Sequence, residues 1–426
     1  MKFPEEFLHF VWQFRLYHPH QLCSTNGELI EVIRTGMHNT NAGPDFLHAK
    51  VSIDKTLWIG NVEIHINSSD WYAHQHQLDE AYDNVILHVV YSHDQSIYRT
   101  DGTSLTTVVL KDQFPTKYLL HYEQLIQSLH HFPCEKQIKE IDPFIIDSFL
   151  TRVAIERLME KSGEVYHKLQ ELKGNWDETF YQFIAKNFGL KLNAVPMEML
   201  ARALPQQILA KHKDNPLQIE ALLFGQAGFL EQKFTDSYPQ QLKREYVFLK
   251  GKYRLKPIPI SVWKFMRMRP QNFPTLRLAQ FAALIVSSNH LFSNVITLKD
   301  FTILNQLFDN LPVNDYWKTH FHFNKEVKHV NLQLGRGTAH NILINTISLF
   351  LFAYGKYIDQ QLLVDRAIAL LEYLPSEQNA ILRQYSHAGI RVTSAFQSQA
   401  LLQLKKIYCN EKKCLNCGIG IKILRK

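Results

Sequence analysis

Two segments near the start of the chain alternate between polar and apolar residues with the period of a β-strand. In residues 46–53 the alternating sets are Phe46, His48, Lys50 and Ser52 against Leu47, Ala49, Val51 and Ile53. In residues 61–67 they are Asn61, Glu63, His65 and Asn67 against Val62, Ile64 and Ile66. Because successive side chains of a strand point to opposite faces, Glu63 and His65 share a face and lie about 6–7 Å apart. The pattern predicts two strands with one polar face.

The remaining N-terminal elements follow from apolar spacing. A wide apolar face predicts a helix over residues 4–16, and further strands are predicted over residues 28–34 and 105–110. The nearly unbroken aliphatic run of residues 84–91 is typical of a strand that is buried on both faces. A helix is predicted over residues 72–83, where His74, Leu78 and Tyr82 would share one face.

The chain becomes almost entirely helical after these strands, and no strand pattern persists past residue 112. We therefore predict an α+β protein, in which a small mixed sheet with flanking helices is followed by a large all-α region. The expected domains are residues 1–112, a linker of residues 113–143 with a helix over 117–131, a helical domain of residues 144–405 and a cysteine-rich tail of residues 406–426.

Candidate chemistry gathers where the two alternating strands begin. Pro44 fixes its own φ and extends the preceding residue, so Asp45 is expected at the mouth of a strand. If the two strands are neighbours, Asp45, Glu63 and His65 meet in an oxygen-rich site for a divalent cation. Histidine is enriched in this part of the chain, with 13 of the 21 residues at or before His131. Three of them, with a nearby acid, are possible accessory residues with either structural or site roles: Glu6, His74, His76 and His88.

The order Pro-Asp followed by Glu-x-His resembles the PD-(D/E)XK nuclease superfamily, and so does the predicted order of helix, three strands, helix and strand. The resemblance implies a restriction-endonuclease-like fold in which Asp45 and Glu63 hold Mg²⁺ or Mn²⁺. His65 stands where the superfamily has lysine, so it could act as a base, act as a ligand or leave the site inactive. The superfamily often adds an acid from the first helix, and here that helix offers Glu5 or Glu6.

Over its whole length the chain is similar to an uncharacterised bacterial family, a domain of unknown function. The segments that carry this similarity are Glu-Glu-Phe-Leu at residues 5–8, Ala-Gly-Pro-Asp-Phe at 42–46, Val-Glu-Ile-His at 62–65, Ser-Ser-Asp-Trp at 68–71 with His74 and His76, and Val-Ile-Leu-His-Val-Val at 85–90. This similarity implies no activity.

Composition describes a globular protein, with 46% hydrophobic and 20% charged residues. The longest apolar run is too short to span a bilayer, and the N-terminus lacks the apolar core of an export signal. We therefore expect a cytoplasmic protein without a membrane partner. The formal charge of +7 is compatible with a polyanionic partner such as nucleic acid.

Residues 233–269 form the most basic stretch of the chain, in which aromatic residues are interleaved with cations. Phosphate neutralisation combined with stacking is typical of nucleic-acid binding. A solvated helix face whose aromatic residues belong to the core gives the same pattern, and both interpretations stay open. The candidate nucleic-acid-binding residues are Lys243, Arg244, Lys250, Lys252, Arg254, Lys264, Arg267 and Arg269.

Three of the five cysteines lie close together as Cys-x4-Cys-x2-Cys, at Cys409, Cys414 and Cys417. In a cytosolic chain such spacing indicates metal binding more than a disulfide. Zinc and iron–sulfur sites commonly need a fourth ligand, for which Cys134 is the candidate. The arrangement resembles the iron–sulfur staple of some PD-(D/E)XK helicase-nucleases. A reduced, metal-free tail is the alternative.

These observations favour a metal-dependent nuclease, in which Asp45, Glu63 and His65 act on phosphodiesters and the basic stretch holds the substrate. A non-catalytic nucleic-acid-binding or assembly protein with a degenerate nuclease fold is one alternative. A second alternative is a histidine-based metallohydrolase that acts on a small substrate through His65, His74, His76 and Asp45. The sequence leaves the oligomeric state open.

Overall fold

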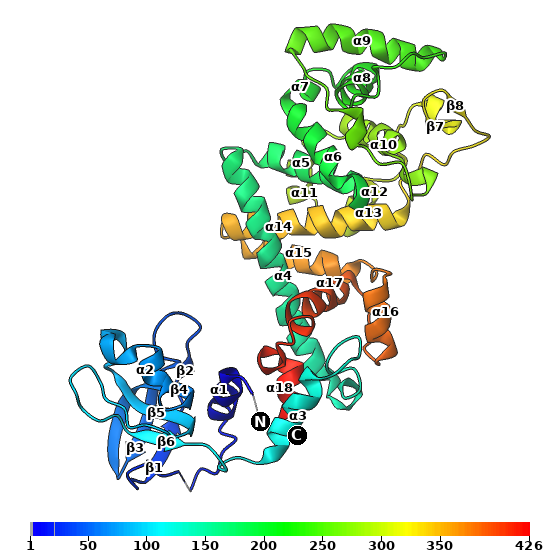
Figure 1. Cartoon of the computed structure of the whole chain (residues 1–426). Coiled ribbons are helices and arrows are strands. Elements are labelled where there is room, and N and C mark those ends of the chain that lie inside the picture. Colours follow the sequence, from blue (N-terminus) through cyan, green and yellow to red (C-terminus); the bar gives the residue numbers. More distant parts are fainter. Residues whose placement is uncertain (1–2, 21) are drawn as a thin grey trace. The chain divides into compact units, whose positions relative to one another are not determined.

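A computed structural model describes residues 3–20 and 22–426, and the chain divides into two compact units (Figure 1). The first unit comprises the chain up to Phe149, together with His387–Gly389 and Leu404–Lys426. The second comprises Leu150–Ser386 and Ile390–Gln403. No helix in the described part of the chain is long and apolar enough to cross a membrane.

A six-stranded mixed sheet forms the centre of the first unit, as the α+β prediction requires. The strand order is β1-β3-β4-β5-β6, with β2 paired to β3. Strands β1, β3 and β4 are antiparallel neighbours, whereas β4, β5 and β6 run parallel. The bounds are β1 (Ile30–Arg34), β2 (Met37–His38), β3 (Phe46–Ile53), β4 (Thr56–Asn67), β5 (Val85–Ser92) and β6 (Thr107–Val109).

The predicted burial of the aliphatic strand is confirmed, because β5 is buried from Val85 to Val90. Its close approach to β4 depends on Gly60, where a Cβ would lie 2.4 Å from Ile86 Cγ2 and 2.6 Å from the Asn84 carbonyl oxygen. Helix α1 (Glu5–Gln13) packs on β4 and buries its apolar face, which includes Phe7, Leu8, Phe10, Val11 and Trp12. The first unit is completed by α3 (Thr116–Ile126) and α18 (Gly418–Leu424).

The single helix predicted over residues 72–83 is wrong. The segment instead contains α2 (Asp70–Ala73) and two 3-10 turns, η1 (His76–Leu78) and η2 (Glu80–Tyr82). Gln75 has a left-handed backbone with φ of 61°, which ends the first helix. The carboxylate of Asp79 then accepts the amide of Ala81 and starts a new turn. Such side-chain caps compete with continuous helix.

The second unit is helical, as predicted, apart from one small hairpin. This hairpin of β7 (His320–His322) and β8 (Lys325–Glu326) corrects the prediction that no strand follows residue 112. Helix α4 begins in the first unit and continues into the second. The bounds are α4 (Pro143–Glu171), α5 (Trp176–Phe188), α6 (Leu190–Ala203), α7 (Gln206–Ala210), α8 (Pro216–Gln226), α9 (Ser237–Tyr253), α10 (Pro274–Ser287), α11 (Leu291–Thr297), α12 (Phe301–Gln306), α13 (Arg336–Ile342), α14 (Ser348–Tyr357), α15 (Gln361–Tyr373), α16 (Ala380–His387) and α17 (Ala395–Gln403).

Candidate metal centre

The two predicted acids lie side by side where β3 enters the sheet beside β4. The backbone amide of Asp45 donates to Glu63 Oε2 at 3.0 Å, and the amide of Ile64 donates to Asp45 Oδ2 at 2.9 Å. The turn before Asp45 is fixed by Gly43, which has a φ of 100°, and by the side chain of Asn39, which donates to the carbonyl of Pro44. The alternation and the Pro-Asp turn thus bring two chain-distant carboxylates together.

The other oxygen of Glu63 faces two histidine rings. Glu63 Oε1 lies 3.6 Å from His65 Nε2 and 3.2 Å from His76 Nε2. All three side chains are buried, and the rings of His65 and His76 are stacked with centroids 5.3 Å apart. A buried carboxylate between two ring nitrogens is a donor set suited to zinc or another first-row divalent metal.

A row of three imidazoles crosses this site. His65 Nε2 lies 3.1 Å from His74 Nδ1, and His65 Nδ1 lies 2.8 Å from His88 Nε2. His88 is fully buried in β5, opposite Glu63 in the parallel ladder. His74 is exposed, so it lies where this histidine cluster opens to solvent. His65, His74 and His76 each offer a ligand atom within 4.8 Å of the others, a spacing compatible with a shared metal ion.

The segment that carries His74 and His76 is held in place by polar contacts at the end of β4. The hydroxyl of Ser68 donates to Asp94 Oδ1 at 2.9 Å, and the hydroxyl of Ser69 donates to Asp94 Oδ2 at 2.7 Å. The fully buried ring of Trp71 packs against the rings of His76 and His88. This packing orients two candidate ligands that a regular helix would not have placed together.

A second group of donors adjoins the first at Asp45. Its members are Glu5, His9 and Asp45, which offer ligand atoms within 4.8 Å of one another. His9 Nε2 lies 3.3 Å from Asp45 Oδ2 and 3.9 Å from Glu5 Oε1. Glu6, the accessory acid of the sequence prediction, is exposed on α1 and is not part of either group among the described residues. Of the expected site, His65 belongs to the first group and Asp45 to the second. Glu63 lies between them, with one oxygen 3.6 Å from His65 Nε2 and the other accepting the amide of Asp45.

One ring nitrogen in these groups has no hydrogen-bond partner although it is buried. His76 Nε2 lies 3.2 Å from Glu63 Oε1, yet it makes no hydrogen bond with it. Buried polar atoms normally find a partner, and each unpaired one costs about 1–3 kcal/mol. A cation between the ring and the carboxylate would satisfy both atoms, so these residues fit a metal ion.

Two carboxyl groups of the site, those of Glu63 and Glu5, hold their protons unusually tightly in the absence of a cation. Burial, and then the charge of Asp45, raises the pKa of Glu63 to about 8. The same two causes raise the pKa of Glu5 to about 7. Burial alone would raise the pKa of Asp45 as well, but the neighbouring His9 ring lowers it below its usual value. The site therefore carries one ionised acid and two acids that a metal ion would deprotonate.

The buried imidazoles are neutral. Burial, and then the neighbouring His76 and His74 rings, lowers the pKa of His65 to about 3. Burial also lowers the pKa of His76 and, more strongly, that of His88. A neutral imidazole with so low a pKa is a poor base at neutral pH but a good ligand. Of the roles left open for His65, the geometry favours that of ligand.

Sequence reasoning missed His9 and left Glu5 undecided. The available signal was their spacing, because residues four apart lie on the same face of a helix. That face of α1 is polar at Glu5 and His9, whereas Phe7, Leu8 and Val11 are buried. Only the docking of α1 on the sheet brings this pair to Asp45.

The four cysteines of the predicted second site surround one pocket in the first unit, whose lining includes Cys134, Cys409, Cys414 and Cys417. All four are buried and none forms a disulfide, whereas Cys23 is exposed. The structure thus brings together residues that lie more than 270 positions apart in the chain.

The predicted nucleic-acid-binding cations lie along α9 and the segment that follows it. Arg244, Lys252, Arg254, Lys264, Arg267 and Arg269 are exposed, whereas Lys243 and Lys250 are half-buried. Most of the interleaved aromatic residues are packed inward, and Tyr246 and Trp263 are buried. Phe248 is the exposed aromatic of the set. The geometry leaves a cationic surface with little aromatic area for base stacking.

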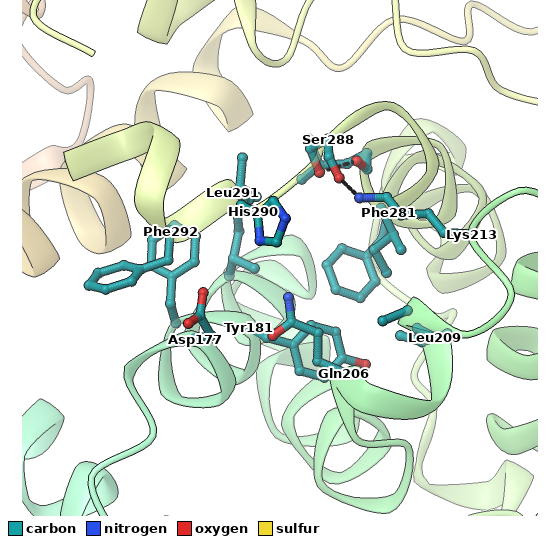
Figure 2. A pocket seen from close by; sticks show the side chains of 15 residues that line it. Asp177, Tyr181, Gln206, Leu209, Lys213, Phe281, Ser288, His290, Leu291 and Phe292 are labelled. Carbon is teal, nitrogen blue, oxygen red and sulfur yellow. Dashed lines mark hydrogen bonds between the residues drawn. The ribbon is translucent and has the colours of Figure 1, made fainter. Parts of the chain in front are cut away.

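The second unit contains a separate cavity of about 60 Å³, shown in Figure 2. Its walls include the rings of Tyr181, Phe281 and Phe292, and Lys213 at its edge donates to the carbonyl of Ser288. The walls are mainly apolar, and the polar residues of the lining also include Asp177, Gln206 and His290.

Residues 5–380 match the model of a family described as a protein of unknown function (DUF2851). The match covers most of the chain, so the protein belongs to this family, and the similarity predicted from its sequence segments is confirmed. No curated protein and no solved structure matches the chain significantly.

Proposed function

We propose that the first unit is a metal-dependent hydrolase that cleaves phosphodiester bonds of nucleic acid. The observation that carries this proposal is the pair of adjoining donor groups, one of His65, His74 and His76 with Glu63 beside them, and one of Glu5, His9 and Asp45. Two bound ions would suit in-line displacement at phosphorus, because they would stabilise the charge on the attacking and leaving oxygens. A bound divalent ion would supply Lewis acidity and lower the pKa of a bound water.

The residues of the two donor groups would serve as metal ligands. Neutral His65 and His76 would be nitrogen ligands, and His88 holds the His65 ring from behind through a 2.8 Å contact. Glu5, His9 and Asp45 would hold the second ion, whose binding would remove the proton that Glu5 retains in the metal-free site. The positive charge that a lysine would bring to such a site would come from the bound ions.

Three observations support nucleic acid as the substrate. The Pro44-Asp45 turn and the Glu63-x-His65 strand follow the order of the nuclease superfamily, and they lie on adjacent strands of a mixed sheet. Exposed cations on and after α9 would neutralise phosphates. The exposed position of His74 leaves the histidine cluster open on one side, as a polymer substrate requires.

Cleavage assays with fluorescent single-stranded DNA, duplex DNA and RNA, in Mn²⁺, Mg²⁺ or Zn²⁺, test the proposal. We expect metal-dependent cleavage that falls at least about 100-fold in Asp45→Asn and His76→Gln, because each removes a ligand. The matched controls Glu6→Gln and His18→Ala change exposed residues of the same types outside the donor groups and should retain activity. Equal cleavage by all four variants would refute the proposal, as would binding of nucleic acid without any cleavage by the wild type.

A histidine-based metallohydrolase acting on a small substrate is the second candidate, and the group of three histidines favours it. Charge reversal at Arg244 and Lys252 separates the two candidates. If nucleic acid is the substrate, the variants should lose affinity and show a shallower dependence of binding on salt. If the substrate is small, metal-dependent hydrolysis of bis(p-nitrophenyl) phosphate would persist while neither DNA nor RNA is cleaved.

A further inference from the structure

Four buried thiols converge on one pocket of the first unit, apart from the histidine and carboxylate groups. Cys134 comes from the segment between α3 and α4, and Cys409, Cys414 and Cys417 come from the last 18 residues of the chain. The other walls of the pocket are Pro133, Tyr408, Lys413 and Gly420. No disulfide links any of the five cysteines.

The backbone around the last cysteine is arranged as it would be around a thiolate. The amides of Gly420 and Ile419 donate to the sulfur of Cys417. This tight loop requires glycine, because a Cβ on Gly420 would lie 2.3 Å from the carbonyl oxygen of Cys414. Hydrogen bonds to cysteine sulfur stabilise its anionic form and are a feature of iron–sulfur and zinc sites.

Packing alone would also bury cysteines, because a free thiol behaves as a small hydrophobic side chain. It does not require four thiols from distant segments to face the same pocket, nor two amides aimed at a sulfur atom. Burial raises the pKa of Cys414 and Cys417 to about 12, and it raises the pKa of Cys134 well above its usual value, so without a cation these groups stay neutral. A coordinated metal would remove the thiol protons.

We propose that Cys134, Cys409, Cys414 and Cys417 bind a metal centre through four thiolates. The centre is of the thiophilic kind, and binding releases the protons of the four thiols. Because no three of these four sulfurs lie within 4.8 Å of one another, their spacing suits an iron–sulfur cluster better than a single zinc ion. It joins the C-terminal segment to the chain that follows the sheet. The same C-terminal segment contacts α3, with Lys412 donating to the carbonyl of Ile126 and Lys117 donating to that of Lys426.

The centre also supports the helix that carries Glu5 and His9. The turn η9 (Cys414–Asn416) packs on α1, and the guanidinium of Arg425 lies 5.0 Å from the centre of the Phe14 ring just after α1. We therefore expect loss of the centre to weaken, without abolishing, metal binding at the histidine and carboxylate groups. This second consequence rests on the proposed function, whereas the four-thiolate centre itself does not.

Elemental analysis of the full chain, purified without oxygen or chelators, tests the centre directly. We expect about one zinc per chain, or two or four irons with equal acid-labile sulfide and visible absorption. The two outcomes identify the metal, and both support the four-thiolate centre. Cys134→Ser and Cys414→Ser should lose the metal, whereas the matched control Cys23→Ser, at an exposed cysteine, should keep it.

A second measurement uses the wild type and does not depend on whether the variants fold. In native protein we expect a thiol reagent to modify Cys23 rapidly and the four buried thiols only with stoichiometric release of metal. Absence of zinc and iron, or modification of all five thiols without metal release, would overturn the proposal. Glu63→Gln should leave the metal content of the cysteine site unchanged, so failure of the hydrolase proposal would not affect this result.

Discussion

Replacing Glu63 with Gln separates metal binding by this residue from its contribution to folding. Because the pKa of Glu63 is about 8, its carboxyl group is largely protonated at pH 6 in metal-free protein. Glutamine has nearly the same shape, and its carbonyl oxygen can still accept the amide of Asp45, as Glu63 Oε2 does at 3.0 Å. We therefore expect the free energy of unfolding at pH 6 to change by less than about 1 kcal/mol.

The metal-bound protein should respond differently, because the substitution removes a carboxylate that lies 3.2 Å from His76 and 3.6 Å from His65. Loss of even an outer partner of a metal costs about 10–100-fold in affinity, so loss of a ligand should cost at least about 100-fold. With metal at about 100 times the wild-type dissociation constant, binding stabilises the wild type by about 2.7 kcal/mol and the variant by about 0.4 kcal/mol.

Thermal unfolding followed by circular dichroism, with and without Mn²⁺, measures this difference. At about 2–4 °C per kcal/mol for a unit of this size, the wild type should gain about 5–10 °C and the variant about 1–2 °C. Mn²⁺ is chosen because thiolates bind it poorly, which limits binding at the cysteine pocket. Glu6→Gln, an exposed acid on α1, is the control and should behave as the wild type. A Glu63→Gln variant that gains as much as the wild type would refute the assignment, and so would a wild type that gains nothing from Mn²⁺ or Zn²⁺.

Further predictions concern pH, the inner imidazole and the backbone. Isothermal titration should show Mn²⁺ affinity rising about tenfold per pH unit from pH 6 to pH 8 and flattening above pH 8, because Glu63 must lose a proton to bind the ion. In metal-free protein the raised pKa of Glu63 instead makes the free energy of unfolding fall between about pH 4.5 and 8. His88→Phe should leave His65 Nδ1 unpaired, which should cost about 1–3 kcal/mol of stability in urea unfolding and weaken metal binding about 10–100-fold. Unchanged metal binding would contradict the proposal that His88 orients the His65 ring. Gly60→Ala should lower the free energy of unfolding by about 1–3 kcal/mol, since its methyl group would lie 2.4 Å from the side chain of Ile86 in β5. Gly163→Ala, at a position of α4 with open space around it, should leave the free energy of unfolding unchanged or raise it. Gln75→Gly should stabilise the first unit by up to about 1 kcal/mol, because Gln75 has a φ of 61° and glycine adopts positive φ without steric cost. Destabilisation would contradict the inference that the backbone is strained at Gln75.

Much of the fold was predictable because it depends on local patterns. Alternation placed β3 and β4, the aliphatic run placed β5, and the apolar face of α1 was read from its spacing. The same alternation put Glu63 and His65 on one face, and the Pro-Asp turn put Asp45 at the mouth of a strand beside them. These inferences needed only the periodicity of the backbone and the geometry of proline.

Local patterns failed where the chain departs from regular geometry. In a continuous helix His74 and His76 would point in nearly opposite directions, since each residue turns the helix by about 100°. The left-handed backbone of Gln75 interrupts the helix between them, and a ring nitrogen of each lies within 4.8 Å of one on His65. Side-chain caps such as that of Asp79 decide this break, and their strength depends on neighbours that helical spacing does not describe.

The sequence by itself determined the strands, the polar face of β4, the helical character of the second half and a cysteine spacing suited to metal. Only the tertiary structure decided that α1 docks with Glu5 and His9 facing Asp45, and that Cys134 meets the C-terminal thiols. The physical reason is that secondary structure follows from interactions between residues a few positions apart. A binding site requires groups from distant segments, and burial of apolar faces elsewhere in the fold fixes their meeting point.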